Sequence, residues 1–302
     1  MKKILLITTG GTIACADTNE ARAPENGAKR LLEKLSALPE NAEITSISPF
    51  CLDSTDMSPK EWTQLAVLVR ENYGQYDGFV ITHGTDTLGY AAAALSCLIQ
   101  NSKKPIVLTG SMLPMTAENS DAPRNLSDAL AFAANENAHG VVVAFDGKII
   151  DGRFAVKVDT KSVSAFESVN EHEKTVGETR FFDKMDARIS VIRLVPGVEP
   201  PIISENTRAV LILGFGTGGL PMYGGWEKWL EKLVSRGVYV IMSTQVLRGG
   251  SKLDLYEVGA RISAEYPVID AGKMTAEYAA MRAMWALAYS DDFDGFRRIF
   301  LQ

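Results

Sequence analysis

The chain has 302 residues, of which 46% are apolar and 23% charged, and its mean hydropathy is zero. This balance is typical of globular domains and excludes an intrinsically disordered chain or a membrane protein. Lys and Arg total 31 against 37 Asp and Glu, so the net charge is −6, which argues against a dedicated nucleic-acid-binding protein. The length predicts about two domains.

The cysteines and the N-terminal segment indicate a compartment. Cys15, Cys51 and Cys97 are too few and too scattered for a disulfide framework or a CxxC metal site. The apolar run near the start covers only Ile4 to Ile7, whereas a signal peptide needs roughly 7–15 apolar residues. No stretch reaches the ~20 apolar residues that cross a bilayer. We therefore expect a cytoplasmic protein that does not contact a membrane.

Short apolar runs alternate with amphipathic segments along the first half of the chain. Strands are predicted over Lys3–Thr8, Glu43–Ile47, Gly78–Thr82, Pro105–Thr109 and Gly140–Phe145. Helices are predicted over Ala28–Leu38, Pro59–Asn72, Leu88–Gln100 and Leu126–Asn135, the second with the capping box Ser58-Pro59-Lys60-Glu61. This alternation predicts a parallel sheet covered on both faces, which binds ligands at the carboxyl ends of its strands.

The alternation breaks after Asp146 and resumes after a proline-rich segment. Extended pieces over Lys148–Ile150, Arg153–Val156 and Ile189–Leu194 predict a hairpin and an edge strand. Strands over Ala209–Leu213 and Val238–Ser243 and helices over Trp226–Arg236 and Ala276–Ala288 follow. We predict an α/β fold with a larger N-terminal, doubly wound, mainly parallel sheet domain over 1–195. A linker over 196–207 and a smaller C-terminal α/β domain over 208–302 complete it.

Hydroxyl side chains and glycines follow three of the predicted strands. The segments are Thr8-Thr9-Gly10-Gly11-Thr12, Thr82-His83-Gly84-Thr85-Asp86-Thr87 and Thr109-Gly110-Ser111. Glycine lets a backbone approach a ligand closely and leaves N–H groups free for an anion. The same residue types are common in turns and helix caps, so one such loop alone would not indicate a site. Threonine pairs after two strands of one sheet favour a site.

A hydroxyl nucleophile needs a base and an oxyanion hole. A Ser-His-Asp triad is not supported, because no G-x-S-x-G motif is present and His139 and His172 fall in a predicted turn and loop. The histidine spacing excludes an HExxH zinc site, and the first glycine loop lacks the G-x-G-x-x-G dinucleotide spacing. Lys157, at the end of an apolar segment, is the remaining candidate base, although a lone lysine is more often exposed.

Two of these segments together resemble a known family. Thr9-Gly10-Gly11-Thr12-Ile13-Ala14 and His83-Gly84-Thr85-Asp86-Thr87 are similar to motifs of the bacterial-type L-asparaginases, which include asparaginase-glutaminases. Further matching segments are Asp53-Ser54-Thr55-Asp56-Met57, Thr109–Ser111 with Ser120–Leu126, Asp151-Gly152-Arg153 with Lys157, and Met274-Thr275-Ala276-Glu277. The resemblance covers nearly the whole chain and is firmest over residues 1–170.

The resemblance implies roles for individual residues. Thr12 would be the nucleophile, and Thr85, Lys157 and Asp86 would form a hydroxyl–lysine–carboxylate group that moves protons. The implied substrate-binding residues are Gly11, Ser54, Thr55, Gly84, Thr85, Asp86 and Ser111. Ser54 and Thr55 would hold the α-carboxylate of the substrate, Asp86 its α-ammonium, and N–H groups near Thr12 and Thr85 the oxyanion.

The implied reaction is the hydrolysis of L-asparagine to L-aspartate and ammonia through an acyl-enzyme. The resemblance implies no metal and no organic cofactor, and a homodimer or homotetramer. The segments Thr244-Gln245 and Tyr256–Gly259 resemble those of the type I, cytoplasmic branch of the family.

The chain departs from the family pattern at the first loop. Family members carry a lid tyrosine there, but no tyrosine precedes Tyr73 and Arg22 stands in its place. Arginine cannot relay a phenolic proton, although it could still close over a ligand. Arg22 is therefore a candidate lid residue, and the alternative is a solvated turn.

A second departure concerns the neighbouring chain that completes the site in some family members. Thr217 and Gly219 stand where an asparagine is expected. Lys252, Asp254 and Glu257 give no clear match to the glutamate of that neighbour. The residues that a partner would contribute are therefore not assigned.

Other functions are compatible with the same loops. One is a broader asparaginase-glutaminase, and another is an amidotransferase subunit acting on tRNA-linked substrates. The acidic charge and the lack of an N-terminal module before Lys3 argue against the tRNA version. A non-catalytic sensor of asparagine or aspartate is the third alternative.

Overall fold

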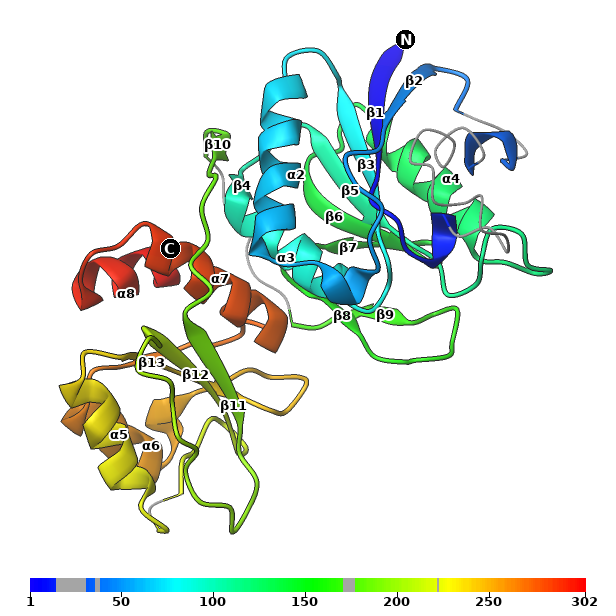
Figure 1. Cartoon of the computed structure of the whole chain (residues 1–302). Helices are drawn as coiled ribbons and strands as arrows, with labels where there is room; N and C mark the ends of the chain where they lie inside the picture. The colour runs from blue at the N-terminus through cyan, green and yellow to red at the C-terminus, as the bar shows by residue number, and fades with distance from the viewer. Residues whose placement is uncertain (15–30, 36–38, 171–176, 222) are drawn as a thin grey trace. The chain divides into compact units, whose positions relative to one another are not determined.

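The computed structural model describes residues 1–14, 31–35, 39–170, 177–221 and 223–302. The chain divides into two compact units (Figure 1). Unit 1 comprises Met1–Ser168 with Glu173–Asp183, and unit 2 comprises Val169–His172 with Lys184–Gln302. No helix within the described ranges is long and apolar enough to cross a bilayer.

A six-stranded sheet forms the centre of unit 1, in the order β2-β1-β3-β5-β6-β7. Its strands are β1 (Lys2–Thr8), β2 (Ala42–Ile47), β3 (Gly78–Thr82), β5 (Pro105–Thr109), β6 (Gly140–Phe145) and β7 (Lys148–Asp151). All neighbouring pairs are parallel except β6 and β7. The parallel sheet predicted from the apolar runs is confirmed.

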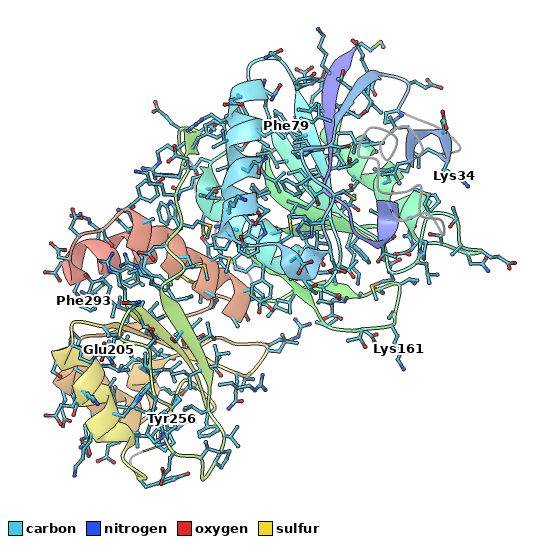
Figure 2. All side chains as sticks on the ribbon, viewed as in Figure 1. Lys34, Phe79, Lys161, Glu205, Tyr256 and Phe293 are labelled. Carbon is cyan, nitrogen blue, oxygen red and sulfur yellow. The ribbon has the colours of Figure 1, made fainter. Side chains whose placement is uncertain are left out.

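Helices cover both faces of this sheet (Figure 1). They are α2 (Pro59–Asn72), α3 (Leu88–Leu98) and α4 (Ala122–Ala133). On one face, Leu6 and Val107 pack with Leu130 of α4 in one apolar cluster. Residues at the alternate positions of the strands point to the opposite face of the sheet. Phe79, labelled in Figure 2, is one of them and is also fully buried. The doubly wound arrangement is therefore confirmed.

Local hydrogen bonds explain where these helices begin. Ser58 Oγ accepts from the Lys60 N–H at 3.4 Å, and the Glu61 carboxylate accepts from the Ser58 N–H at 3.1 Å. This is the predicted capping box, with Pro59 at the first helical position. Helix α4 begins at Ala122, earlier than predicted, with Pro123 in its first turn, and Ser120 Oγ accepts from the Ala122 N–H at 3.1 Å.

Two other segments differ from their predicted bounds. Helix α3 ends at Leu98 because the next residues form β4 (Ile99–Gln100), which pairs with β10 (Arg180–Phe181). Of the helix predicted over Ala28–Leu38, the structure describes only residues 31–35, of which 31–33 are helical.

A hairpin carries Lys157 in unit 1. It consists of β8 (Ala155–Lys157) and β9 (Phe166–Ser168), which pair antiparallel with Lys157 opposite Phe166. Lys161 lies in the loop between the two strands (Figure 2). The extended pieces predicted over Lys148–Ile150 and Arg153–Val156 are both strands, but they do not pair with each other: β7 pairs with β6, and β8 pairs with β9, a strand that was not predicted.

Unit 2 contains a four-stranded parallel sheet in the order β11-β12-β13-β14. The strands are β11 (Ile189–Arg193), β12 (Ala209–Gly214), β13 (Tyr239–Thr244) and β14 (Val268–Asp270). The helices are α5 (Trp226–Ser235), α6 (Glu257–Glu265), α7 (Ala276–Ala288) and α8 (Phe293–Leu301). A larger unit with a mainly parallel sheet and a smaller α/β unit are thus confirmed.

The edge strand predicted over Ile189–Leu194 is β11, and it lies at the edge of the unit 2 sheet. Strand β11 pairs with β12 along its whole length, and Ile192 packs against the apolar core of unit 2. Residues 196–207 consequently lead from one strand of this sheet to the next.

Candidate active site

The predicted site loops emerge at one edge of the unit 1 sheet. Thr8 at the end of β1 is in register with Thr82 at the end of β3, and Thr82 is in register with Thr109 at the end of β5. The three loops that follow these strands therefore leave the sheet side by side. This is the carboxyl edge, where α/β sheets bind their ligands.

The loops of Thr12 and Thr85 touch through their glycines. Gly11 has a φ of +78°, and a methyl group on it would lie 2.5 Å from the backbone nitrogen of Gly84. A side chain there would meet both an unfavourable backbone conformation and a steric clash. Only glycine at position 11 allows this approach, which brings the Thr12 loop against the Thr85 loop.

A further loop, with Ser54, packs against the same place. A methyl group on Gly84 would lie 2.6 Å from the Ser54 hydroxyl oxygen. The Thr87 hydroxyl donates to the Ser54 carbonyl at 2.7 Å, and the Leu52 N–H donates to the Thr9 carbonyl at 2.9 Å. Ser54 is buried beneath Gly84. The structure thus brings the predicted residues Gly11, Gly84 and Ser54 together.

Thr55 is exposed beside Ser54 and is fixed by Asp53. The Asp53 carboxylate accepts from the Thr55 N–H at 2.9 Å and from its hydroxyl at 2.8 Å. These two hydrogen bonds lower the pKa of Asp53 below its ordinary value. Asp53 was not predicted to be a site residue, although an aspartate two residues before a threonine is a recognisable turn signal.

Lys157 joins Thr85 and Asp86. Its amine donates to the Thr85 hydroxyl at 3.0 Å and to the Asp86 carboxylate at 2.7 Å. The Lys157 side chain is 18% exposed and that of Asp86 is 64% exposed. The lysine is therefore held in a hydrogen-bonded group of three residues and does not extend into solvent.

Close packing of helix α3 on strand β8 positions the lysine. A methyl group on Gly89, in the first turn of α3, would lie 2.7 Å from the Ala155 carbonyl oxygen. Thr85 and Asp86 directly precede this helix, and Lys157 follows Ala155 on the strand. The contact sets the separation of the two segments.

Thr12 is half-buried at the first position of the short helix η1 (Thr12–Ala14). Within the described part of the chain, its hydroxyl makes no hydrogen bond. Neither its backbone N–H nor that of Thr85 donates to another described residue. A hydroxyl and two N–H groups are thus available to a ligand at the edge where these loops meet.

His83 lies beneath this edge as a neutral side chain. It is fully buried, and burial lowers the pKa of its imidazole from 6.5 to about 4. Its Nδ1 lies 2.8 Å from the Gly84 carbonyl oxygen, so Nδ1 carries the proton. Its Nε2 has no partner among the described residues. His83 therefore holds the Gly84 backbone as a hydrogen-bond donor.

Ser111, after β5, is buried, and its hydroxyl donates to the Leu113 carbonyl at 2.6 Å. It therefore orders its own loop. Arg22, the candidate lid residue, lies outside the described residues. Among the described residues, no cluster of three His, Cys, Asp or Glu side chains could hold a metal ion.

Thr217 and Gly219, which stand where the family pattern has an asparagine, lie in the loop that follows β12 at the carboxyl edge of the unit 2 sheet. The Lys252 N–H donates to the Thr217 carbonyl at 2.9 Å, and Gly219 forms a bridge with Phe215. Asp254 lies in the short helix η4 (Leu253–Leu255), and Glu257 is the first residue of α6. These contacts order the loops of unit 2.

Two family models match consecutive parts of the chain. "Asparaginase, N-terminal" matches residues 3–185, and "Glutaminase/Asparaginase C-terminal domain" matches residues 188–300. Together they span nearly the whole sequence.

Known proteins of similar sequence and structure agree with this match. The chain is 39% identical to an L-asparaginase of Thermococcus kodakarensis over 98% of this chain and 96% of the relative. It superposes on the solved structure of the thermostable L-asparaginase from Thermococcus kodakarensis with a TM-score of 0.90 and 36% identity, over 99% and 97% of the two chains. It is also 30% identical to a component of the glutamyl-tRNA(Gln) amidotransferase of Pyrococcus abyssi, over all of this chain and 75% of that protein. The chain belongs to the asparaginase family.

Proposed function

We propose that the protein is an amidohydrolase that converts L-asparagine to L-aspartate and ammonia. The observation that carries the proposal is the Thr85–Lys157–Asp86 group, placed where the Thr12 and Thr85 loops touch. Such a group can move protons next to a free hydroxyl, which amide hydrolysis by a hydroxyl nucleophile requires. Relatives named L-asparaginase along almost the whole chain support the same activity.

The first half of the reaction forms an ester on Thr12. The Thr12 oxygen attacks the side-chain amide carbon, and the free N–H groups of Thr12 and Thr85 stabilise the oxyanion. The proton of the Thr12 hydroxyl passes to the amide nitrogen, which leaves as ammonia. We assign this transfer to the Thr85–Lys157–Asp86 group. The product of this half is an aspartyl ester of Thr12.

The second half hydrolyses that ester. A water molecule attacks the acyl carbon and gives one proton back to the Thr12 oxygen as the ester bond breaks. L-aspartate leaves and the free Thr12 hydroxyl is restored. The same proton-moving group serves both halves, because the two reactions are chemically the reverse of each other at Thr12.

The two charged ends of the substrate need opposite partners. The exposed Asp86 carboxylate suits an α-ammonium group. Hydroxyl donors suit the α-carboxylate, and we assign this role to Ser54 and to Thr55, whose hydroxyl donates to Asp53 in this structure. Gly11 and Gly84 let the substrate-binding loops approach one another closely, and Ser111 orders the adjoining loop. No nucleic acid or membrane takes part in this proposal.

Ammonia release from the purified protein tests the activity. With L-asparagine, ammonia and L-aspartate are expected in equal amounts. Calorimetric binding of L-asparagine without any ammonia would instead identify a sensor and would contradict the proposal.

The amidotransferase relative supports one alternative, a protein that releases ammonia for a second reaction. A broader asparaginase-glutaminase is another, because one of the two matching family models covers glutaminases. The ratio of kcat/KM values for L-asparagine and L-glutamine separates these cases. We expect L-asparagine to be preferred by at least ~10-fold, since one added methylene is worth about 1–3 kcal/mol in a fitted pocket.

We also propose a cytoplasmic homodimer or homotetramer. The exposed Cys51 is a free thiol, as expected in a reducing compartment. Unit 2 exposes several apolar side chains between β13 and α6: Val246, Leu247, Leu255 and Tyr256. Exposed apolar groups of this kind often mark contacts between subunits. Light scattering after size-exclusion chromatography measures the mass, and a monomer would contradict this part of the proposal.

A further inference from the structure

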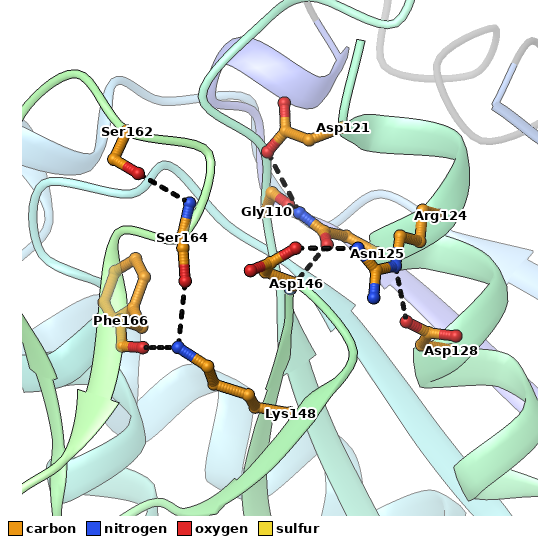
Figure 3. A network of polar contacts seen from close by, with 10 residues as sticks. All are labelled: Gly110, Asp121, Arg124, Asn125, Asp128, Asp146, Lys148, Ser162, Ser164 and Phe166. Carbon is orange, nitrogen blue, oxygen red and sulfur yellow. Dashed lines mark hydrogen bonds and ion pairs between the residues drawn. The ribbon is translucent and has the colours of Figure 1, made fainter. Parts of the chain in front are cut away.

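The buried side chain of Asn125 is a member of a polar network in unit 1 (Figure 3). Its amide nitrogen donates to the Gly110 carbonyl and to the Asp121 carboxylate, each at 3.0 Å. Its amide oxygen accepts from the Asp146 N–H at 2.8 Å. The residue is fully buried, so each of these bonds is costly to lose.

Asp121 extends the network along the loop after β5. Its two carboxylate oxygens accept from the Met112 N–H at 2.9 Å and from the Leu113 N–H at 3.0 Å. Asn125 holds the carbonyl of Gly110 at the other end of the same segment. The two side chains together fix the backbone from Gly110 to Leu113, which includes Ser111.

This loop packs directly against the backbone of the candidate active site. A side chain on Gly110 would collide with the carbonyl oxygen of His83. The His83 N–H donates to the Thr109 carbonyl at 2.8 Å, and the His83 ring holds the Gly84 carbonyl. A movement of Gly110 would therefore displace the His83–Gly84 backbone and, with it, Thr85.

Asn125 also reaches the turn between β6 and β7. Asp146 in that turn has a φ of +48°, and its N–H is held by the Asn125 amide oxygen. Its carboxylate is held separately by Arg124, at 2.7 Å. The buried Asn125 amide thus forms hydrogen bonds to two loops at the same edge of the sheet.

We propose that Asn125 is a positioning residue for the reaction, which acts through Gly110 and His83 on the placement of Thr85. It does not touch the reacting atoms. The inference rests on the proposed amidohydrolase activity. Asparagine is a poor helix former, and none of the capping roles that usually explain it near a helix start applies to these three bonds.

Asn125→Asp tests the proposal with a side chain of nearly the same shape. The variant keeps the acceptor for Asp146 and replaces the donor by an oxygen, next to the Asp121 carboxylate and the Gly110 carbonyl. The other charged groups of this network are Asp128, Arg124 and the Asp146 carboxylate, which Arg124 already pairs. Two ionised carboxyl groups this close repel each other, which raises the pKa of the new acid, so it takes up a proton as the pH falls towards 5.

We expect kcat/KM at pH 8 to fall ~100-fold in Asn125→Asp, the typical cost of a small misplacement at a catalytic group. The loss relative to the unsubstituted protein should shrink towards pH 5, because the protonated acid can donate one of the two lost hydrogen bonds. Asn125→Leu should show a similar loss without recovery at low pH. A merely structural role would not produce this pH-dependent rescue.

Arg124→Gln is the matched control, because it loosens the same turn at Asp146 and leaves the bond to Gly110 intact. It should keep kcat/KM within ~2-fold. The proposal is overturned if Asn125→Asp retains kcat/KM within ~3-fold at pH 8, or loses it equally at every pH. If Asn125→Leu does not fold, the pH profile of Asn125→Asp decides.

Failure of the positioning role of Asn125 and failure of the proposed function give different experimental results. If the unsubstituted protein releases no ammonia, the proposed function fails and L-aspartate affinity becomes the readout. Asn125→Asp should then bind L-aspartate ~10-fold more weakly than Arg124→Gln at pH 8. Equal affinities would overturn the positioning role as well.

Discussion

The Lys157 amine lies 3.0 Å from the Thr85 hydroxyl, although 72 residues separate the two in the chain. The contact is short enough for direct proton transfer. It exists because Gly89 at the start of α3 packs on the Ala155 carbonyl next to Lys157. The proton-moving group of the proposed mechanism therefore depends on helix–strand packing.

Lys157→Met removes the amine and keeps an unbranched side chain. We expect kcat for L-asparagine to fall by ~100-fold or more, the usual worth of a positioned acid or base, while the secondary structure is retained. Ammonia release under saturating substrate measures the effect. Lys148→Met is the control, since Lys148 bonds to Ser164 and Phe166 and not to Thr85. Equal activity of Lys157→Met and Lys148→Met would contradict the assigned role.

Gly11→Ala tests the contact between the Thr12 and Thr85 loops. The new methyl group would lie 2.5 Å from the Gly84 nitrogen, so one loop must move. We expect loss of most ammonia release, together with about 1–3 kcal/mol of destabilisation from backbone strain. Urea unfolding and the ammonia assay measure the two effects.

Gly140 provides a matched control for this strain. Its φ is +81°, close to that of Gly11, but a methyl group on it would meet no atom within 4 Å. Gly140→Ala should cost stability through its backbone conformation alone and retain full kcat. If both alanine variants keep full activity, the close approach of the two loops is not needed for the reaction.

Because His83 is buried in its neutral form, we expect the protein to lose stability at acid pH. Its pKa is about 4 in the folded protein and 6.5 when exposed, so the unfolded chain binds the proton first as the pH falls. The folded state should lose roughly 3 kcal/mol between pH 6.5 and pH 4, with no effect of this group above pH 7. Urea unfolding at several pH values measures the slope.

His83→Asn should remove that acid-side loss, because the asparagine amide nitrogen can replace Nδ1 as a neutral donor to Gly84. Over the same pH interval, the difference in unfolding free energy between the two proteins should narrow as the pH falls. Parallel pH profiles would show that burial of His83 does not determine the acid response.

The parts of the fold that follow from local sequence were predicted correctly. Strands such as Gly78–Thr82 are continuous apolar runs, and Ser58 and Glu61 mark the start of α2. The sheet to which Ile189–Arg193 belongs could not be predicted, because strand pairing is a long-range choice that its alternating pattern does not encode. Strand β14 is only three residues long and gives no periodic signal.

In the candidate site, too, some residues can be predicted from local sequence and others cannot. The Thr12 and Thr85 loops stand out because hydroxyls and glycines follow apolar strands. The roles of Asn125 and Asp121 were missed, since polar residues near a helix start are expected as caps. Only the folded chain places Asn125 against Gly110 and Asp121 against Met112 and Leu113.

The central claim is that Thr12 is the nucleophile of an asparaginase. The rate of ammonia release from L-asparagine by Thr12→Ala tests it most directly, with retained binding of L-aspartate as evidence of an intact fold. We predict a loss of ~1,000-fold or more, since no other described hydroxyl is assigned to attack the amide. Full activity of Thr12→Ala would contradict the account.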